Sequence, residues 1–324
     1  MRAIVCDNYG EVEDLRLTAI DAPTPRSGEV LIRVNAAGVN FADTLMIKGS
    51  YQEKPTPPFT PGMEVAGEVV AVGPDVHRVA PGERVMAVVG HGGFAERVIA
   101  RAADCFVIPG VMDDVTAAGF PITYGTAHGA LVWRARIQHG ETLLVHGAAG
   151  GAGLAAVEVG KALGARVIAT AGGSDKTEVA RAHGADRVID YKTEDIRERV
   201  KSLTDGRGAD VVFDPVGGEV FDASMRCIAW CGRIVVIGFA SGTVPAPPAN
   251  ILMVKNIGVL GLHWGSYRTH APDLLHRQFG ELFRWYEAGL VHPLVGETHP
   301  LEETVAALRR LKSRQSTGKI VLAT

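Results

Sequence analysis

The feature that most restricts the fold is an apolar run that leads directly into a cluster of small residues. Thr142–His146 reads as a strand, Gly147–Gly153 follows at once, and a helical pattern continues beyond it. Such a turn lets a pyrophosphate approach backbone N–H groups at a helix N-terminus, where side chains would block it. Against the pattern G-x-G-x-x-G, the key positions hold Ala148, Gly150 and Gly153. Glycines also serve tight packing, but a second strand about 20 residues further on favours a nucleotide site.

The end of that second strand indicates which nucleotide binds. NAD-binding proteins usually place an acid there to hold the ribose hydroxyls. Arg166–Thr170 and Ala171 offer no acid, whereas Ser174 and Lys176 follow closely. A hydroxyl and a cation suit a 2′-phosphate, so we predict NADPH. Alternatively, Lys176 is a solvated residue in the first turn of a helix.

The chain of 324 residues shows two different sequence patterns in succession. Residues 1–121 are dense in short β-like runs separated by Gly and Pro, which predicts a β barrel or sandwich. Residues 122–261 alternate strands and helices, which predicts an α/β fold with a doubly wound parallel sheet. We expect six strands in it: Thr142–His146, Arg166–Thr170, Arg187–Asp190, Val211–Asp214, Arg233–Gly238 and Ile257–Gly261. Residues 262–324 add two helices and a strand, Lys319–Ala323, that could return to the first domain.

Composition excludes several classes of protein. The net charge of −3 gives no basic field for nucleic acid. No apolar run is long enough to span a membrane, and the N-terminus lacks the features of a signal peptide, so we expect a cytoplasmic protein. The four cysteines are too scattered for a disulfide framework or a metal cluster. We expect Cys227 and Cys231 to be buried thiols.

Several motifs together resemble one family. They are Gly38–Asp43 with Lys48–Tyr51, Pro61–Gly67, Thr126-Ala127 with Leu131, Ala148–Gly153, and Thr317–Leu322. The chain resembles the zinc-independent quinone oxidoreductases of the medium-chain dehydrogenase/reductase superfamily, the group that includes zeta-crystallin. The resemblance implies a GroES-like catalytic domain (residues 1–121 and 262–324) and a Rossmann domain (residues 122–261).

The resemblance also implies site residues. For the cofactor they are Thr126, Ala149, Gly150, Gly151, Ala152, Ser174, Lys176, Tyr191, Gly238, Phe239 and, less directly, Arg314. Lys176 and Tyr191 match positions that hold the 2′-phosphate, and Arg314 could join them from the C-terminal segment. Phe239 lies in the Gly238–Gly242 stretch that covers the nicotinamide. For catalysis they are Asn40 and Tyr51. Asn40 could donate a hydrogen bond to an acceptor oxygen or only satisfy a turn. Tyr51 could donate a proton or only line the pocket.

Metal ligands of the related zinc enzymes are missing. Asn40 stands where a ligand cysteine would be, Met63 stands where a histidine would precede Glu64, and the expected four-cysteine lobe holds only Cys105. Zinc would help an alcohol lose hydride, so we expect reduction of an activated acceptor instead, a quinone or an α,β-unsaturated carbonyl.

Alternatives remain open at this point. An enoyl-thioester reductase shares the fold and the hydride chemistry. A crystallin-like or RNA-binding protein with little catalysis is a further possibility. We also expect a homodimer, in which strand Arg233–Gly238 pairs edge to edge across a two-fold axis. Asp43 is expected to cap a helix over Asp43–Lys48.

Overall fold

The computed structural model describes residues 1–324, which form two compact units. The first unit comprises Met1–Ile122, Tyr267–Phe283 and Pro293–Thr324, and the second comprises Thr123–Ser266 and Arg284–His292. The sequence assigned all of residues 262–324 to the first domain. In the structure, the beginning of that stretch and the segment Arg284–His292 pack with the second unit instead.

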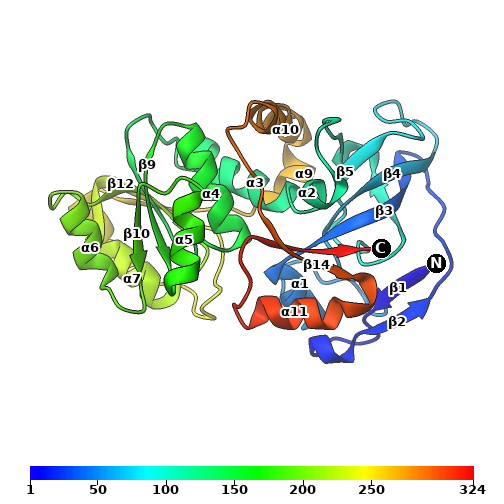
Figure 1. Cartoon of the computed structure of the whole chain (residues 1–324), viewed down its shortest axis with the longest axis horizontal. Helices are drawn as coiled ribbons and strands as arrows, with labels where there is room; N and C mark the ends of the chain where they lie inside the picture. The colour runs from blue at the N-terminus through cyan, green and yellow to red at the C-terminus, as the bar shows by residue number, and fades with distance from the viewer. The chain divides into compact units, whose positions relative to one another are not determined.

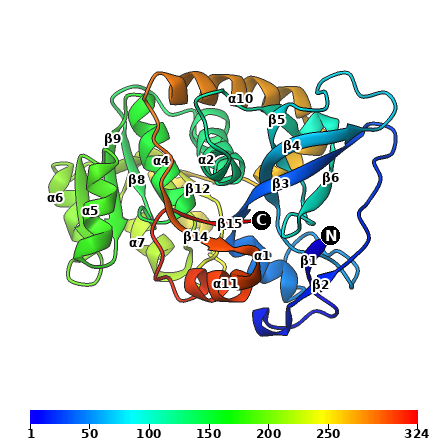
Figure 2. The ribbon, with the colours of Figure 1, turned by 45° about the vertical axis from the view of Figure 1, so that its right-hand side comes forward.

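The first unit is built on β-sheet. A seven-stranded sheet follows the order β14-β15-β3-β4-β5-β7, with β6 also paired to β3, and β1 and β2 form a separate pair. Its strands are β1 (Arg2–Val5), β2 (Arg16–Ala19), β3 (Glu29–Val39), β4 (Glu64–Val72), β5 (Arg84–Val88), β6 (Arg97–Arg101), β7 (Cys105–Val107), β14 (Val295–Pro300) and β15 (Lys319–Ala323). The C-terminal strand β15 pairs antiparallel with β3, as Figure 2 shows, so the chain's last segment returns to this unit as predicted.

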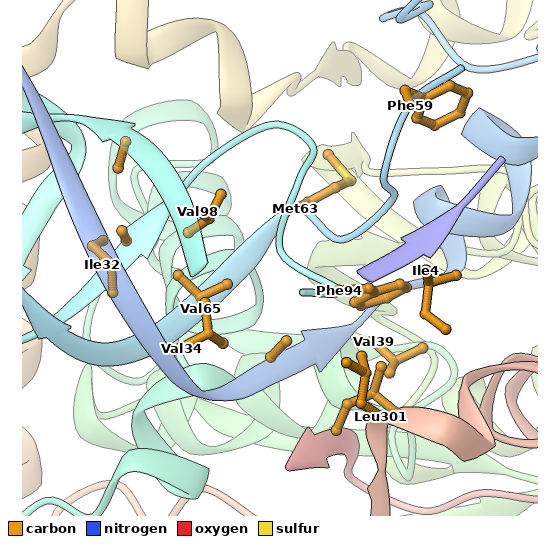
Figure 3. Close-up of a cluster of buried hydrophobic side chains, with 14 of the residues drawn as sticks. Ile4, Ile32, Val34, Val39, Phe59, Met63, Val65, Phe94, Val98 and Leu301 are labelled. Carbon is orange, nitrogen blue, oxygen red and sulfur yellow. The ribbon is translucent and has the colours of Figure 1, made fainter. Parts of the chain in front are cut away.

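Apolar side chains from distant strands fill the core of the first unit. Figure 3 shows Ile32 and Val34 of β3, Val65 of β4 and Phe94 as parts of one cluster. All four are nearly or completely inaccessible to water. Burial of such side chains contributes about 1.5–3 kcal/mol each, which fixes the ends of β3 and β4 where polar residues lie.

Five helices complete this unit: α1 (Phe41–Ile47), α2 (Asp114–Ala118), α9 (Tyr267–His270), α10 (Pro272–Glu287, which continues into the second unit) and α11 (Thr304–Lys312). The predicted helix over Asp43–Lys48 begins two residues earlier, with Asn40 as its N-cap residue. Asp43 is therefore the third residue of the helix and not its cap. Its carboxylate still serves the helix end, because Oδ2 accepts from the backbone N–H of Asn40 at 2.7 Å.

The second unit contains the predicted six-stranded parallel sheet. Its order is β10-β9-β8-β11-β12-β13, and every neighbouring pair is parallel. The strands are β8 (Thr142–Val145), β9 (Arg166–Ala171), β10 (Arg187–Asp190), β11 (Ala209–Asp214), β12 (Ile228–Val236) and β13 (Gly258–Gly261). This order reverses direction between β8 and β11, as in dinucleotide-binding folds, so the predicted fold class is confirmed.

Helices connect these strands: α3 (Pro121–His128), α4 (Gly151–Ala162), α5 (Ser174–Ala182), α6 (Ile196–Leu203), α7 (Gly218–Cys227) and α8 (Ala249–Lys255). Right-handed crossovers place α4 and α5 on one face of the sheet, since the chain winds in the opposite direction after β11. Figure 1 shows α6 beside α7. The sheet is apolar on its inner positions, with Leu144, Ile168 and Val212 fully buried.

Two expectations for this unit are wrong. The strand over Arg233–Gly238 is not at an edge of the sheet, because β12 lies between β11 and β13, and the edge strands are β10 and β13. Cys231 is exposed, whereas Cys227 is buried. A left-handed backbone at Cys231 (φ 62°) turns its side chain away from the core.

None of the chain's helices combines the length and the apolar composition that a membrane crossing requires.

Candidate functional site

The glycine turn of the second unit lies where the sequence placed it, between β8 and α4. Gly147 adopts a left-handed backbone (φ 61°), which returns the chain over the end of β8. Gly150 is the N-cap residue of α4, and no side chain caps this helix end. The first N–H groups of a helix have no partner within the helix, and the helix dipole favours an anion beside them. Ala149 and Gly150 belong to this turn, and Gly151 and Ala152 are the first two residues of α4.

Gly150 and Gly153 are glycines for different physical reasons. A Cβ on Gly153 would lie 2.2 Å from the carbonyl oxygen of Gly147, so packing within the protein requires glycine there. A Cβ on Gly150 would meet only that same oxygen, at an ordinary distance of 3.5 Å, and its backbone is extended. The fold itself therefore tolerates a side chain at Gly150. A phosphate group that approaches the backbone explains this glycine, so the turn fits a dinucleotide.

Near the end of β9, the hydroxyl of Thr170 is buried and contacts His146. His146 Nδ1 lies 3.0 Å from the Thr170 hydroxyl, and its Nε2 lies 2.7 Å from the Ser224 hydroxyl. The Ser224 hydroxyl donates to the carbonyl of Val220, so it accepts from Nε2–H, and Nδ1 accepts from Thr170. Burial lowers the pKa of His146 to about 4, which keeps the ring neutral. Thr170 thus contributes to the core and offers no carboxylate to a ribose.

Asp190 joins the turn after β9 to the turn after β10. Its Oδ1 accepts from the N–H groups of Gly173 and Lys192, at 2.9 and 3.0 Å, and these bonds lower the pKa of the carboxyl. Tyr191 is about half-exposed, and its phenol oxygen lies 2.6 Å from where a Cβ on Gly172 would be. Tyr191 therefore lies against the turn that precedes α5.

Sequence reasoning missed Lys192 and Asp190 at this place. The Lys192 ammonium lies 3.7 Å from the Cβ position of Gly173, beside the start of α5 where Ser174 and Lys176 lie. The signal in the sequence was the run of Asp190, Tyr191 and Lys192 at the end of β10. It becomes informative only when the register between β9 and β10 brings both turns together.

The turn after β11 positions the Gly238–Gly242 segment. Asp214 Oδ1 accepts from the N–H groups of Val216 and Gly217, and the N–H groups of Ala240 and Ser241 donate to the carbonyls of Pro215 and Val216. The Phe239 ring is partly exposed and lies against Gly217. Gly238 and Phe239 are therefore held at the same edge of the sheet as the glycine turn, because all parallel strands end there.

Helix α3 carries Thr126, which is mostly buried. A Cβ on Gly125 would lie 2.5 Å from the indole of Trp264, so that ring packs directly on the helix. This contact explains why the residues just after β13 belong to the second unit.

In the first unit, Asn40 lies in a buried polar cluster. Its Nδ2 donates to Glu64 Oε1 at 2.9 Å and, weakly, to the carbonyl of Gly38 at 3.4 Å. Its Oδ1 accepts from Lys319 Nζ at 2.9 Å. Lys319 also forms an ion pair with Glu64, at 2.7 Å. We call Asn40, Glu64 and Lys319 the Asn40 cluster.

Asp43 and Tyr51 lie near this cluster. Burial raises the pKa of Asp43 to about 7, and its Oδ1 is buried without a hydrogen-bond partner. Tyr51 packs partly buried against the core. Burial, with Glu53 and Asp43 as negative neighbours, raises the pKa of Tyr51 to about 12, so its phenol keeps its proton at neutral pH.

The residues that stand at zinc-ligand positions form no metal centre. Met63 is buried in the core, and Cys105 is a buried free thiol whose pKa burial raises to about 12. No group of three or more His, Cys, Asp or Glu side chains is arranged to hold a metal ion.

The structure thus collects the predicted residues in two places. Most of the predicted cofactor residues, including Ser174, Lys176 and Tyr191, lie at the carboxyl end of the parallel sheet. Asn40, Tyr51 and Arg314 belong to the first unit, and Arg314 lies between α11 and β15 with a left-handed backbone. The roles assigned to these residues stay predictions.

Sequence comparison is consistent with both units. The profile described as "Alcohol dehydrogenase GroES-like domain" matches residues 26–110, and the one described as "Zinc-binding dehydrogenase" matches residues 151–279. A curated relative, quinone oxidoreductase-like protein 2 homolog of Nematostella vectensis, is 40% identical over 100% of this chain and 89% of its own length. The chain belongs to the quinone oxidoreductase family. The predicted family of the medium-chain dehydrogenases/reductases is therefore confirmed.

Solved structures of this family agree in fold. Escherichia coli quinone oxidoreductase, solved with NADPH, is 30% identical and superimposes with a TM-score of 0.94 over 100% of both chains. A mycobacterial protein, also solved with NADPH, is 32% identical with a TM-score of 0.94, again over 100% of both chains. The GroES-like and Rossmann assignments are thereby confirmed.

The two glycines of the turn give a matched pair of variants. We expect Gly150→Ala to fold with an unchanged melting temperature but to bind NADPH at least roughly tenfold more weakly, because the methyl group occupies the phosphate's approach. Gly153→Ala should instead lower the stability by about 1–3 kcal/mol through overpacking. Thermal unfolding and fluorescence titration with NADPH measure both effects. Wild-type affinity in Gly150→Ala would contradict a phosphate at this turn.

Proposed function

We propose that this chain reduces quinones or related α,β-unsaturated carbonyl compounds with NADPH, and that it does so without zinc. The observation that carries the proposal is the relation to quinone oxidoreductases along the whole chain. It combines with a dinucleotide turn whose neighbouring strand ends without an acid.

The protein is an NADPH-dependent oxidoreductase. Its family relatives have been solved with NADPH, and the second unit supplies the turns that such a cofactor needs. Ala149–Ala152 would lie against the pyrophosphate. Ser174, Lys176 and Tyr191 would hold the 2′-phosphate, with the ammonium of Lys192 nearby.

The bound cofactor supplies a hydride from C4 of its dihydronicotinamide, and the protein's residues supply position and a proton. Tyr51 suits the second task, because its phenol is protonated at neutral pH and can donate a hydrogen bond or a proton. It would donate to the acceptor oxygen as negative charge develops there. Phe239 and Thr126 would lie beside the nicotinamide and limit access of water.

Asn40 suits a hydrogen-bonding role at the same oxygen. One of its amide N–H groups is committed to Glu64, whereas the other makes only the 3.4 Å contact with Gly38. That second N–H could donate to an acceptor without rotation of the amide, and the contact that it would give up is weak at that length.

A metal-free reaction is supported by the side chains at the ligand positions. An amide at Asn40 and a thioether at Met63 are poor ligands for zinc, which prefers thiolate, imidazole and carboxylate groups. A quinone or enone is already electron-poor and needs less polarisation than an alcohol or simple ketone. Enoyl-thioester reduction uses the same hydride chemistry and is the second candidate.

A panel of acceptors tests the proposal. We expect steady oxidation of NADPH, followed by its absorbance, with 9,10-phenanthrenequinone and 1,4-benzoquinone and little with crotonyl-CoA. Faster turnover of crotonyl-CoA would favour the enoyl-thioester reading. Binding of NADPH without turnover of any acceptor would refute the enzymatic role.

Cofactor preference depends on charge at the start of α5. We expect Lys176→Glu to weaken NADPH binding roughly tenfold to a hundredfold and to leave NADH binding nearly unchanged, since only NADPH carries the 2′-phosphate. Arg181→Glu, in the last turn of the same helix, is the charge-matched control and should leave both affinities near wild type. Equal losses for NADPH and NADH in Lys176→Glu would exclude the phosphate contact.

A homodimer remains part of the proposal, now through β13. This strand is one of the two edges of the parallel sheet, and Trp230, Met253 and Val254 are large apolar side chains exposed on neighbouring elements. A second copy would pair with the edge and cover them. Light scattering at micromolar protein should give twice the chain mass, and a charged substitution such as Met253→Glu should reduce it. A monomeric mass for the wild-type chain would exclude the dimer.

A further inference from the structure

The Asn40 cluster contains a buried ion pair that no step of the proposed reaction uses. Lys319 Nζ donates to Glu64 Oε1 at 2.7 Å, to Asn40 Oδ1 at 2.9 Å and to the carbonyl of Val39 at 2.9 Å. These contacts use all three hydrogens of the ammonium. Glu64 is fully buried and Lys319 nearly so. Removal of one partner from such a pair leaves an uncompensated buried charge.

The chemistry of the two partners determines how the Asn40 amide is oriented. An ammonium only donates hydrogen bonds, and a carboxylate only accepts them. Lys319 therefore requires Oδ1 on its side, and Glu64 requires Nδ2 on its side. If the amide rotated by half a turn, its oxygen would face a carboxylate and its N–H groups would face an ammonium.

This orientation leaves one N–H of Asn40 for other use. The first hydrogen on Nδ2 points to Glu64 at 2.9 Å, and the second makes the long 3.4 Å contact with Gly38. A flipped amide would present its carbonyl oxygen in place of this second N–H. An oxygen there would repel an acceptor oxygen on which negative charge is building.

We infer that Lys319, acting with Glu64, is a positioning residue that holds the Asn40 amide with an N–H directed to the electron acceptor. The inference rests on the proposed function, and assigns to the C-terminal strand β15 a part in the reaction. The strand register supports it, because Ile320 is paired with Val39, which brings the preceding Lys319 next to Asn40.

Glu64 has a second contact that extends the same arrangement. Its Oε2 accepts from the N–H of Ile122 at 2.8 Å, at the first turn of α3. One buried carboxylate therefore holds both the Asn40 amide and the backbone of Ile122, the residue at which the first segment of this unit ends.

A double-mutant cycle distinguishes positioning from simple stabilisation. If Lys319 acts through Asn40, Lys319→Met and Asn40→Ala should each lower kcat roughly tenfold to a hundredfold, and the double variant should be no slower than Asn40→Ala alone. The affinity for NADPH, measured by fluorescence titration, should stay within about threefold of wild type. Lys319→Arg retains the donors and should recover most of kcat.

Two further variants control for damage to the fold. Lys312→Met removes a lysine from an exposed ion pair with Glu11 in the same unit, and should leave kcat unchanged. Lys319→Met with Glu64→Gln removes both buried charges together, so it should unfold at a higher temperature than Lys319→Met while kcat stays low. If Lys319→Met alone does not fold, the cycle with Asn40→Ala is run in the Glu64→Gln background.

Three results would overturn the inference. They are a kcat of Lys319→Met close to wild type, losses from Lys319→Met and Asn40→Ala that multiply, and a recovery of kcat together with stability in the variant lacking both charges. Wild-type protein that binds NADPH but reduces no acceptor would overturn the proposed function and this inference with it. Turnover by the wild-type protein is therefore measured first. It separates a failure of the proposed function from a failure of the positioning role of Lys319.

Discussion

The buried pair of Lys319 and Glu64 is the interaction on which the first unit's polar site depends. It joins β15, the last strand of the chain, to the start of β4 and to the end of β3. Buried charges are costly unless every donor and acceptor is satisfied, and here the backbone and Asn40 satisfy them. The arrangement keeps an amide, an ammonium and two carboxyl groups inside an otherwise apolar core.

In the second unit, backbone N–H groups at the starts of α4 and α5 are not capped by side chains, and such groups suit an anionic ligand. The parallel strands of this unit end at one edge of the sheet, and the helices that follow begin there with uncapped N–H groups. Glycine appears at two kinds of position in these turns. At Gly153 and Gly172 the protein itself occupies the space, whereas at Gly150 the space is open. The open position is the one that indicates a ligand.

The two units divide the proposed labour accordingly. In the proposed function, the second unit would hold the cofactor through backbone groups and a few cations. The first unit would offer hydrogen bonds to the acceptor through Tyr51 and Asn40. Burial disfavours charge on both rings, since it lowers the pKa of His146 and raises the pKa of Tyr51. It therefore favours the neutral form of a ring in each unit.

The sequence by itself determined the α/β fold class, the six parallel strands, the glycine turn and the missing acid at the end of β9, because these depend on local pattern and spacing. It also located Asn40, Tyr51 and Lys176 through motifs. It could not show that β13 forms the sheet edge, that Cys231 is exposed, or that Asp43 is the third residue of α1. Nor could it place Lys319 against Asn40, which is 279 residues away. Those facts depend on strand order, register and backbone conformation, which only the tertiary structure decides.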